Sequence, residues 1–331
     1  MSAAMSFPEF WLESQRLHFF TLDLFMMLRS AVFLTTVVCS LMTVEGRAAD
    51  APVIRHSYLV MGQKTAIIDE EGKVAWEYEG GSRDGFVLPD GRVLLAYGDR
   101  VVEVTRDREI VFSYKVSGEN SEISTAQRLA GGRTLITELG ARPRVLEVDA
   151  AGVVVASVPL QPGTDNVHMQ TRMARKLPNG HYLVPHLLDF AVKEYAADGS
   201  VVSTLKTDRP ELGGRAAENW PFTAIRLANG HTLSSLTHGH KVVEFNPVGE
   251  IVWMVTNDDV KGVFRDTCGA QRLANGHTVI GSHAAATGVS MVEVTREKTI
   301  VWTSDHPYAA NIHHFQILTT NGSPEPLPSL K

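Results

Sequence analysis

Short runs in which apolar and polar residues alternate recur along the chain, and tight glycine turns join them in pairs. The turn is most regular at residues 225–232 and 271–278, which read IRLANGHT and QRLANGHT. Weaker copies of the turn end at Gly91, Gly132 and Gly180. Alternation with a period of two predicts half-buried β-strands, and an Asn-Gly pair supplies the positive φ values that a tight hairpin needs. Repeats of about four short strands predict a β-propeller.

The two ends of the chain are expected to complete one blade together. In the last full repeat, strands a to d are predicted at Gly269–Leu273, Thr278–Ser282, Ser290–Thr295 and Thr299–Thr303. Strands b, c and d without a strand a are predicted at Tyr58–Met61, Thr65–Asp69 and Lys73–Tyr78, whereas His313–Leu318 reads as a strand a without successors. Joining these segments removes the open sheet edge that a propeller must not leave. The prediction is an all-β, six-bladed β-propeller of four-stranded blades over residues 55–322, with a Pro-rich tail, 323–331, that is expected to be disordered.

Several polar residues repeat with the blades, which indicates a structural role. A glutamate recurs at one position of strand c, as Glu103, Glu147, Glu194, Glu244 and Glu293. An active-site acid would be singular, so these copies predict hydrogen bonding within or between blades. The same argument applies to the residues after the turn glycine, which are His181, His231 and His277 in three repeats and Arg92 and Arg133 in two others.

The first fifty residues do not share the repeat. Residues 26–49 combine Arg29, an apolar stretch from Ala31 to Met42 and small residues at Ala48 and Ala49, as a secretory signal peptide does. The stretch is short for a membrane span, and an uncleaved signal anchor is the alternative. Residues 1–25 are interpreted as an extension from a misplaced start codon. The mature protein is expected to be exported, periplasmic or extracellular, with no stable membrane span. Its single thiol, Cys268, excludes an intramolecular disulfide.

Composition narrows the range of partners. The chain has 331 residues, of which 44% are hydrophobic, and a formal net charge of −6. This composition suits one large soluble core. It offers no clustered basic face, so a nucleic-acid partner is not expected. A small anionic molecule, a polysaccharide or a protein remain as partners.

Function is expected on the face of the ring where the d–a connections and b–c loops lie. These segments are long and irregular, as in Thr207–Pro221 and Thr256–Thr267, and binding residues concentrate in variable loops on a rigid frame. The candidate residues lie near the ends of strand b or the starts of strand a; they are His168, Arg172, His186, Trp220, His238, His240, Arg265, His283, His313 and His314. Because strand a is innermost in a blade, we expect His168, His313 and His314 to lie at or near the central channel.

Converging histidines allow three interpretations. Neutral imidazoles can bind a divalent metal and leave coordination positions open for catalysis. One histidine can instead act as a nucleophile or base while an arginine stabilises an anion. The histidines can also be inert residues that line a wet channel, because a fold does not imply a function. The spacing of the histidines identifies no metal ligands.

The repeat also resembles the PQQ-like and arylsulfotransferase-like propeller repeats of exported bacterial proteins. The resemblance rests on the Asn-Gly-His-x-Leu turn and the Glu-x-x-x-x-Gly-x-Ile-Val-Trp ending, and it covers residues 56–322. In arylsulfotransferase-like proteins, a histidine shortly before such a turn accepts the sulfate group. The resemblance places that role on His168 and implies that Arg172 or Arg265 binds the sulfuryl oxygens. A PQQ cofactor is not expected, because vicinal cysteines are absent and six blades are fewer than the alcohol-dehydrogenase type uses.

Three functions therefore stay open. The first is anion binding, with sulfuryl or other group transfer by His168. The second is a non-catalytic scaffold that binds a polysaccharide or a protein, for which an exposed aromatic such as Trp220 would provide a sugar-binding surface. The third is a metal-dependent lyase or hydrolase that uses the channel histidines. The sequence leaves open whether the protein is an enzyme.

Overall fold

The computed structural model describes residues 53–285, 287–327 and Lys331. The predicted signal peptide and the predicted extension before it lie outside the described residues. Within the described part of the chain, no helix is long and apolar enough to cross a membrane.

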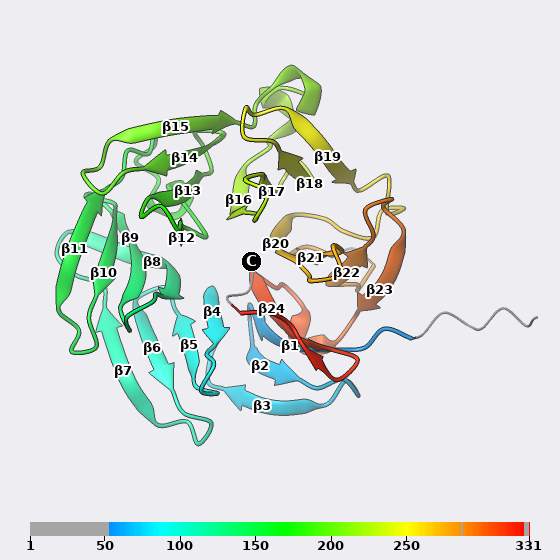
Figure 1. The fold of residues 1–331 in the computed structure, drawn as a ribbon, viewed down its shortest axis with the longest axis horizontal. Coiled ribbons are helices and arrows are strands. Elements are labelled where there is room, and N and C mark those ends of the chain that lie inside the picture. Colours follow the sequence, from blue (N-terminus) through cyan, green and yellow to red (C-terminus); the bar gives the residue numbers. More distant parts are fainter. Residues whose placement is uncertain (1–52, 286, 328–330) are drawn as a thin grey trace, which may run out of the picture. The chain divides into compact units, whose positions relative to one another are not determined.

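Six antiparallel sheets surround a central axis, which confirms the predicted six-bladed propeller (Figure 1). Blade 1 combines β24 (His314–Thr320), β1 (His56–Met61), β2 (Thr65–Ile68) and β3 (Val74–Tyr78). Blade 2 contains β4 (Asp84–Val87), β5 (Val93–Ala96), β6 (Arg100–Val104) and β7 (Ile110–Lys115). Blade 3 contains β8 (Asn120–Arg128), β9 (Thr134–Gly140), β10 (Arg144–Val148) and β11 (Val154–Pro159).

The remaining blades repeat the same order of strands from the axis outwards. Blade 4 contains β12 (Arg175–Lys176), β13 (Tyr182–His186), β14 (Ala191–Tyr195) and β15 (Val201–Lys206). Blade 5 contains β16 (Pro221–Arg226), β17 (Thr232–Leu236), β18 (Lys241–Phe245) and β19 (Ile251–Thr256). Blade 6 contains β20 (Thr267–Arg272), β21 (Thr278–Ser282), β22 (Met291–Val294) and β23 (Ile300–Ser304). Four short 3₁₀ helices lie in the connections, η1 (Val167–Met169), η2 (Pro210–Leu212), η3 (Arg215–Ala217) and η4 (Pro307–Ala309).

The ring closes as predicted. The C-terminal β24 pairs antiparallel with the N-terminal β1, with Phe315 opposite Val60 and His314 opposite Met61. On the inner side of β24, β25 (Ser323–Pro324) pairs with Thr319 and Thr320. Closure of the ring removes the exposed edges on which another chain could add a strand.

The tail corrects one expectation. Residues 323–331 were expected to be disordered, yet Pro324 pairs with Thr319 in β25, and Lys331 is only 1% exposed. The end of the chain lies at the centre of the ring (Figure 1). The physical reason is tertiary, because the ammonium group of Lys331 meets the buried carboxylate of Asp84, 3.3 Å away, and composition alone does not reveal such a partner.

The repeated glutamates link neighbouring blades, as the pattern predicted. Glu244 on β18 accepts hydrogen bonds from His231 in its own blade, at 2.7 Å, and from Arg272 in the next blade, at 2.8 Å. Glu194 is bonded in the same way by His181 and Arg226, at 2.8 and 3.0 Å. The other copies also join their own turn to the following blade. They do so through three three-residue groups, Arg92–Glu103–Arg128, Arg133–Glu147–Lys176 and His277–Glu293–His56.

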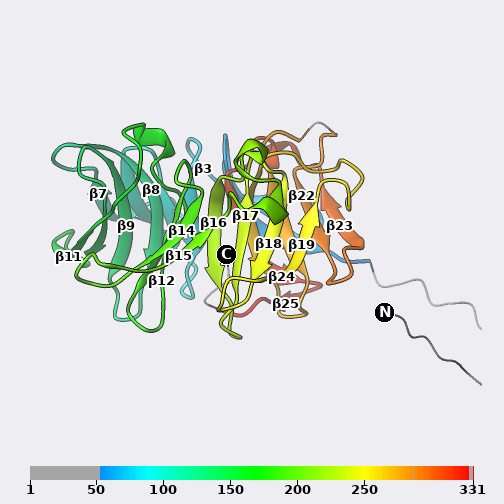
Figure 2. The same cartoon turned by 90° about the horizontal axis from the view of Figure 1, so that it is seen from above.

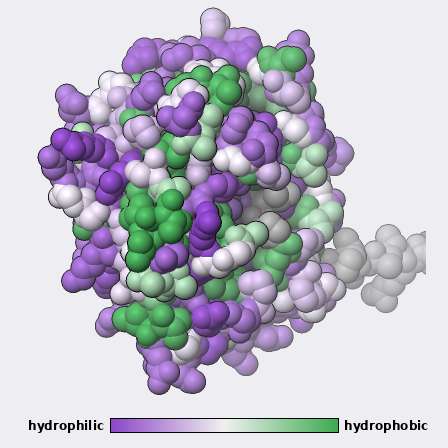
Figure 3. Space-filling view, turned by 60° about the vertical axis from the view of Figure 1, so that its left-hand side comes forward, coloured by the Kyte–Doolittle hydropathy of each residue, from purple (hydrophilic) through white to green (hydrophobic). Residues whose placement is uncertain are grey.

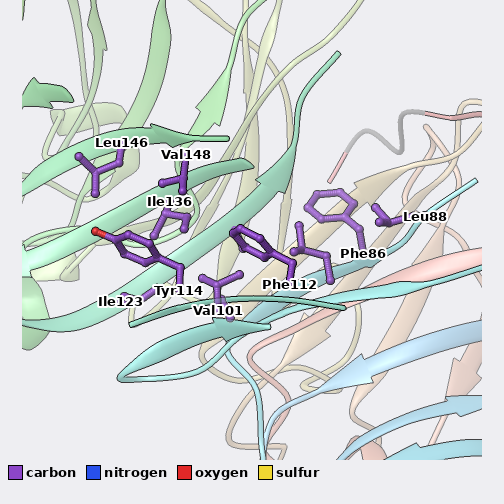
Figure 4. Packing of buried hydrophobic residues seen from close by; sticks show 12 residues of the cluster. Phe86, Leu88, Val101, Phe112, Tyr114, Ile123, Ile136, Leu146 and Val148 are labelled. Carbon is purple, nitrogen blue, oxygen red and sulfur yellow. The ribbon is translucent and has the colours of Figure 1, made fainter. Parts of the chain in front are cut away.

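Apolar side chains pack between neighbouring sheets and form the core. Figure 4 shows one such cluster, in which Phe86, Val101 and Phe112 of blade 2 lie close to Ile123 and Leu146 of blade 3. Side chains from adjacent blades thus pack in one apolar layer between the two sheets. This packing fixes how the inner strands are placed around the axis.

The outer strands differ between blades in how well they are covered. Trp253 in blade 5 donates its Nε1–H to the Arg296 carbonyl of blade 6 at 2.7 Å. At the equivalent position, blades 3 and 4 carry Ala156 and Ser203, paired opposite the repeated glutamate. Apolar residues there face solvent, among them Val155 at 46% exposed. Figure 3 shows such apolar patches within a largely hydrophilic surface.

Candidate functional site

The connections divide the ring into two faces, which the side view separates (Figure 2). We call the face with the a–b and c–d turns the turn face and the opposite one the loop face. The candidate site lies where the inner strands begin on the loop face. It consists of Arg83, Glu122, His168, Arg172, His283 and His313, and we call this group the mouth site.

A carboxylate at the mouth site holds one arginine and one histidine. Glu122, near the start of β8, accepts a hydrogen bond from Arg83 Nη1 at 2.6 Å, and His168 Nδ1 lies 3.2 Å from the same Oε2. The hydrogen bond from His168, followed by that from Arg83, lowers the pKa of Glu122 to about 2. Glu122 is therefore ionised at neutral pH, and it orients the His168 ring through Nδ1.

His168 itself lies at the rim of the channel. The residue belongs to η1, in the connection between blades 3 and 4, and its side chain is 57% exposed. The residue precedes the innermost strand of blade 4, and its exposed ring can meet a molecule that arrives from solvent. With Nδ1 directed at Glu122, Nε2 is the nitrogen available to a ligand.

Arg172 is the most unusual group at the mouth site. Its side chain is buried, its Nη1 donates to the Thr171 carbonyl at 2.9 Å, and its guanidinium lies 5.8 Å from the centroid of the Phe222 ring. Among the described residues, no carboxylate lies within 4 Å of it. Burial lowers the pKa of Arg172 to about 10, so the group is still charged at neutral pH. A buried cation without a paired anion is costly, and a bound anion would offset that cost.

Two further histidines complete the mouth site. The rings of His283 and His313 are 5.0 Å apart between centroids, and the Nδ1 of each is buried without a hydrogen-bond partner among the described residues. Burial, followed by the charges of His283 and Arg172, lowers the pKa of His313 to about 3. His313 is therefore neutral at physiological pH, and its ring offers a hydrogen bond without adding charge.

Other predicted residues form a second group on the same face, at blades 5 and 6. His238 stacks on Trp220 with 4.0 Å between ring centroids, and its Nδ1 lies 3.2 Å from Glu218. His240 accepts a hydrogen bond from the Asp266 amide at 3.0 Å, and burial lowers its pKa. Because His238 already covers Trp220, that indole face is not free in this conformation.

Arg265 does not join the mouth site. Its side chain is exposed, and its backbone amide donates to Ser282 Oγ at 2.7 Å. Arg172 and Arg265 were equal candidates for binding an anion from the sequence, and the structure separates them by burial. Arg265 is therefore a natural control for experiments on Arg172.

Two predicted histidines lie inside the protein rather than at the mouth. His186 is fully buried, and both ring nitrogens are occupied, by the Gln170 carbonyl at 3.1 Å and the Tyr195 hydroxyl at 2.9 Å. Burial lowers the pKa of His186 to about 3. His314 is also fully buried, and it lies one residue deeper in the channel than His313.

No metal-binding group emerges from the described residues. Among them, no cluster of three or more His, Cys, Asp or Glu side chains could hold a metal ion. The thiol of Cys268 packs beside Met173 and Phe222, and burial raises its pKa to about 12. It behaves as a small apolar residue rather than as a thiolate ligand or nucleophile.

Sequence reasoning missed Arg83 and Glu122, because the search followed histidines. A usable signal was present, since both residues lie at the start of an inner strand, as do Arg172 and His313 in their own blades. Comparing the first residues of strand a across the blades would have placed all four at the mouth of the channel.

Two pockets open on the turn face, away from the mouth site. One has a volume of about 690 Å³ and lies beside blades 1 and 2. The other has about 870 Å³ and is lined by Phe86, Leu129, Leu177 and, from the tail, Leu327. The mouth site lines neither of them, so it is a polar cluster at the channel opening rather than a deep apolar cavity.

Comparison with known proteins supports the fold. No model of a known protein family matches the chain, and no curated protein matches it. Among solved structures, a protein of unknown function from Bacteroides caccae is 24% identical with a TM-score of 0.69, and the match covers 79% of this chain and 98% of that one. A catalytically inactive histidine-to-alanine variant of virginiamycin B lyase from Staphylococcus aureus, with quinupristin, is 12% identical with a TM-score of 0.56, over 80% and 92% of the two chains.

A WD40 domain gives a similar match. The WD40 β-propeller domain of Doa1 is 11% identical with a TM-score of 0.53, over 78% of this chain and 81% of that domain. At these identities the matches establish a β-propeller and nothing finer. The resemblance to arylsulfotransferase-like repeats stays a prediction.

Proposed function

We propose that the protein binds a small anion at the mouth site through Arg172, and that His168 acts on the bound molecule. The observation that carries this proposal is the buried guanidinium of Arg172, which has no carboxylate within 4 Å among the described residues. Ionic hydrogen bonds in a buried setting are stronger than those at the surface, and a planar guanidinium suits the oxygens of sulfate, phosphate or carboxylate groups. An aryl sulfate is the first substrate to test.

The role proposed for His168 follows from its contact with Glu122. A carboxylate that holds Nδ1 fixes the ring and favours a proton on that nitrogen, which leaves the Nε2 lone pair to attack or to accept a proton. In sulfuryl transfer, His168 Nε2 would form a bond to sulfur while the bond between sulfur and the aryl oxygen breaks. The aryl group would leave with that oxygen as a phenolate. Arg172 would stabilise the negative charge on the sulfuryl oxygens.

A lyase reaction is the second candidate. In such a reaction His168 would remove a proton from the bound molecule instead of attacking it, and the Glu122–His168 contact at 3.2 Å would support the imidazolium that forms. The structural similarity to virginiamycin B lyase is at the level of fold, so the contact itself is the argument. A polysaccharide- or protein-binding scaffold, exported from the cell, remains the non-catalytic alternative.

Calorimetric titration with 4-nitrophenyl sulfate and with inorganic sulfate tests the binding step. We expect Arg172→Met to weaken binding at least about tenfold, the loss expected when a charge-assisted hydrogen bond is removed. Arg172→Lys, which keeps the charge, should retain part of the affinity. The matched control Arg265→Met removes an exposed arginine from the same face and should change the affinity less than about twofold. Equal losses in the two methionine variants, or no binding by the wild type, would refute the proposal.

Turnover separates catalysis from binding. His168→Ala should abolish release of 4-nitrophenol while leaving the dissociation constant for sulfate nearly unchanged. Glu122→Gln should lower kcat, because the neutral amide no longer supports an imidazolium at His168. Full activity in His168→Ala would exclude both the nucleophile and the base role of this histidine.

A further inference from the structure

A lysine side chain is fully buried where inner strands of three blades begin. The side chains of Lys331 and Asp84 are both 0% exposed, and Lys331 Nζ lies 3.3 Å from Asp84 Oδ1. The same ammonium nitrogen is 3.9 Å from the centroid of the Phe86 ring. Lysine is almost never fully buried without such a setting, so the channel here provides a built receptacle for an amine.

The walls of this receptacle come from three blades. Asp84 begins β4, His314 begins β24 and Arg175 begins β12. Arg175 donates hydrogen bonds to the Asp84 carboxylate from Nη1 at 2.8 Å and from Nη2 at 3.1 Å. Fully buried His314 keeps its Nε2 without a hydrogen-bond partner among the described residues. A side chain that enters thus meets a carboxylate, an aromatic face and a free imidazole nitrogen.

The charges of the walls decide which chemistry fits. Arg175 faces the carboxylate of Asp84, and its Nε also donates a hydrogen bond to the main-chain oxygen of Lys331 at 2.9 Å. Burial lowers the pKa of Lys331 to about 7, and Arg175 adds to this while Asp84 opposes it. A primary amine, which can gain or lose a proton near this value, fits the contacts that Lys331 Nζ makes with Asp84 at 3.3 Å and with the Phe86 ring at 3.9 Å.

We propose that Asp84, Phe86 and His314 form a recognition site for a primary alkylamine, and that Lys331 occupies this site as an intramolecular ligand. The site is distinct from the mouth site, although Asp84 and His314 follow Arg83 and His313 in the chain. A free molecule that carries a primary amine competes with the tail for the channel. In the wild type the tethered lysine has a high effective concentration and keeps such ligands out.

The variant Lys331→Ala of the full chain empties the site and allows the test. n-Butylamine has the stem and amine that the variant lacks, and n-butanol is its uncharged match in length. We expect n-butylamine to bind this variant saturably in calorimetry and to raise its Tm, with at least about tenfold weaker binding to wild type, the minimum we expect from an occupied site. n-Butanol should produce no saturable binding. Absence of n-butylamine binding, or equal binding of n-butanol, overturns the proposal.

Dependence on pH provides a second readout. A free alkylamine resembles an ordinary lysine side chain, with a pKa near 10.4, whereas the bound amine should titrate close to the value of Lys331, about 7. Binding therefore releases a proton between these values, and affinity should rise as pH increases from about 7 to 10. Asp84, Arg175 and His314 face the amine. Although burial raises the pKa of Asp84, the charge of Arg175 lowers it overall, and burial keeps His314 neutral throughout. Affinity that falls over this range contradicts the proposed site.

Two further variants test the contact residues separately, so that the test still stands if one of the variants does not fold. In the Lys331→Ala background, Asp84→Asn removes the carboxylate, and Phe86→Leu removes the ring while keeping apolar volume. Each should weaken n-butylamine binding by about tenfold, which is near the lower end of the range for a lost hydrogen bond to a charged group and within the range for a cation–π contact. If Asp84→Asn does not fold, Phe86→Leu carries the test, and unchanged affinity in that variant overturns the proposal.

Discussion

Replacing Glu244 by glutamine should destabilise the junction between blades 5 and 6. Although burial raises the pKa of Glu244, hydrogen bonds from Arg296, His231 and Arg272 prevail and lower it from 4.5 to about 2. A difference of about 2.5 pKa units corresponds to about 3 kcal/mol at 1.36 kcal/mol per unit. The side chain is only 2% exposed, so solvent screens these contacts little. Because glutamine keeps part of the hydrogen bonding, we expect a loss of about 2–3 kcal/mol in the free energy of unfolding at pH 7.

The sign of the pH dependence makes the prediction specific. The pKa of Glu244 is lower in the folded protein than in the unfolded chain, so its stabilisation is present above about pH 4.5 and is lost as pH falls toward 2. Urea unfolding of wild type and Glu244→Gln between pH 7 and pH 3 should show the difference shrinking. Glu297→Gln is the control, because Glu297 is exposed in the adjoining turn and forms no ion pair with a described residue. A difference that does not change with pH, or an equal loss in the control, would refute the reasoning.

Two other changes test the packing described above. Trp253→Ala should lower the free energy of unfolding by about 3–5 kcal/mol, the usual range for deleting a large buried aromatic side chain. Trp253→Phe should lower it clearly less, although this variant also loses the hydrogen bond to the Arg296 carbonyl. Chemical unfolding of both variants measures the two losses. Cys268 should react with iodoacetamide far more slowly in the folded protein than in urea at pH 8, because burial raises its pKa to about 12; equal rates would contradict a closed core at that position.

Much of the fold was predictable because the repeat is visible in patterns of a few consecutive residues. Alternation and Asn-Gly turns act within a few residues, so the predicted Thr278–Ser282 coincides with β21 and the predicted Tyr58–Met61 falls inside β1. Closure by the two ends followed from counting which strands each end lacked. The docking of Lys331 was not predictable in this way, because its partner Asp84 is 247 positions away in the sequence.

The candidate site was predictable only in part. The blade order placed His168, Arg172, His283 and His313 on one face, and the structure brings these four together. It also shows what the sequence cannot, namely which polar groups are already satisfied. His186 uses both ring nitrogens within the protein, whereas Arg172 has no anionic partner among the described residues. Burial and partners, rather than residue type, separate the candidates.

A crystal of the protein soaked in selenate gives the most direct test of the mouth site, because selenium marks the anion by its anomalous scattering. We predict a selenate peak within hydrogen-bond distance of the Arg172 guanidinium, on the side that faces His168, and its loss in Arg172→Met crystals treated in the same way. Selenate bound only at exposed arginines such as Arg265, or an unchanged peak in the variant, would contradict the assignment of Arg172 as the anion-binding residue.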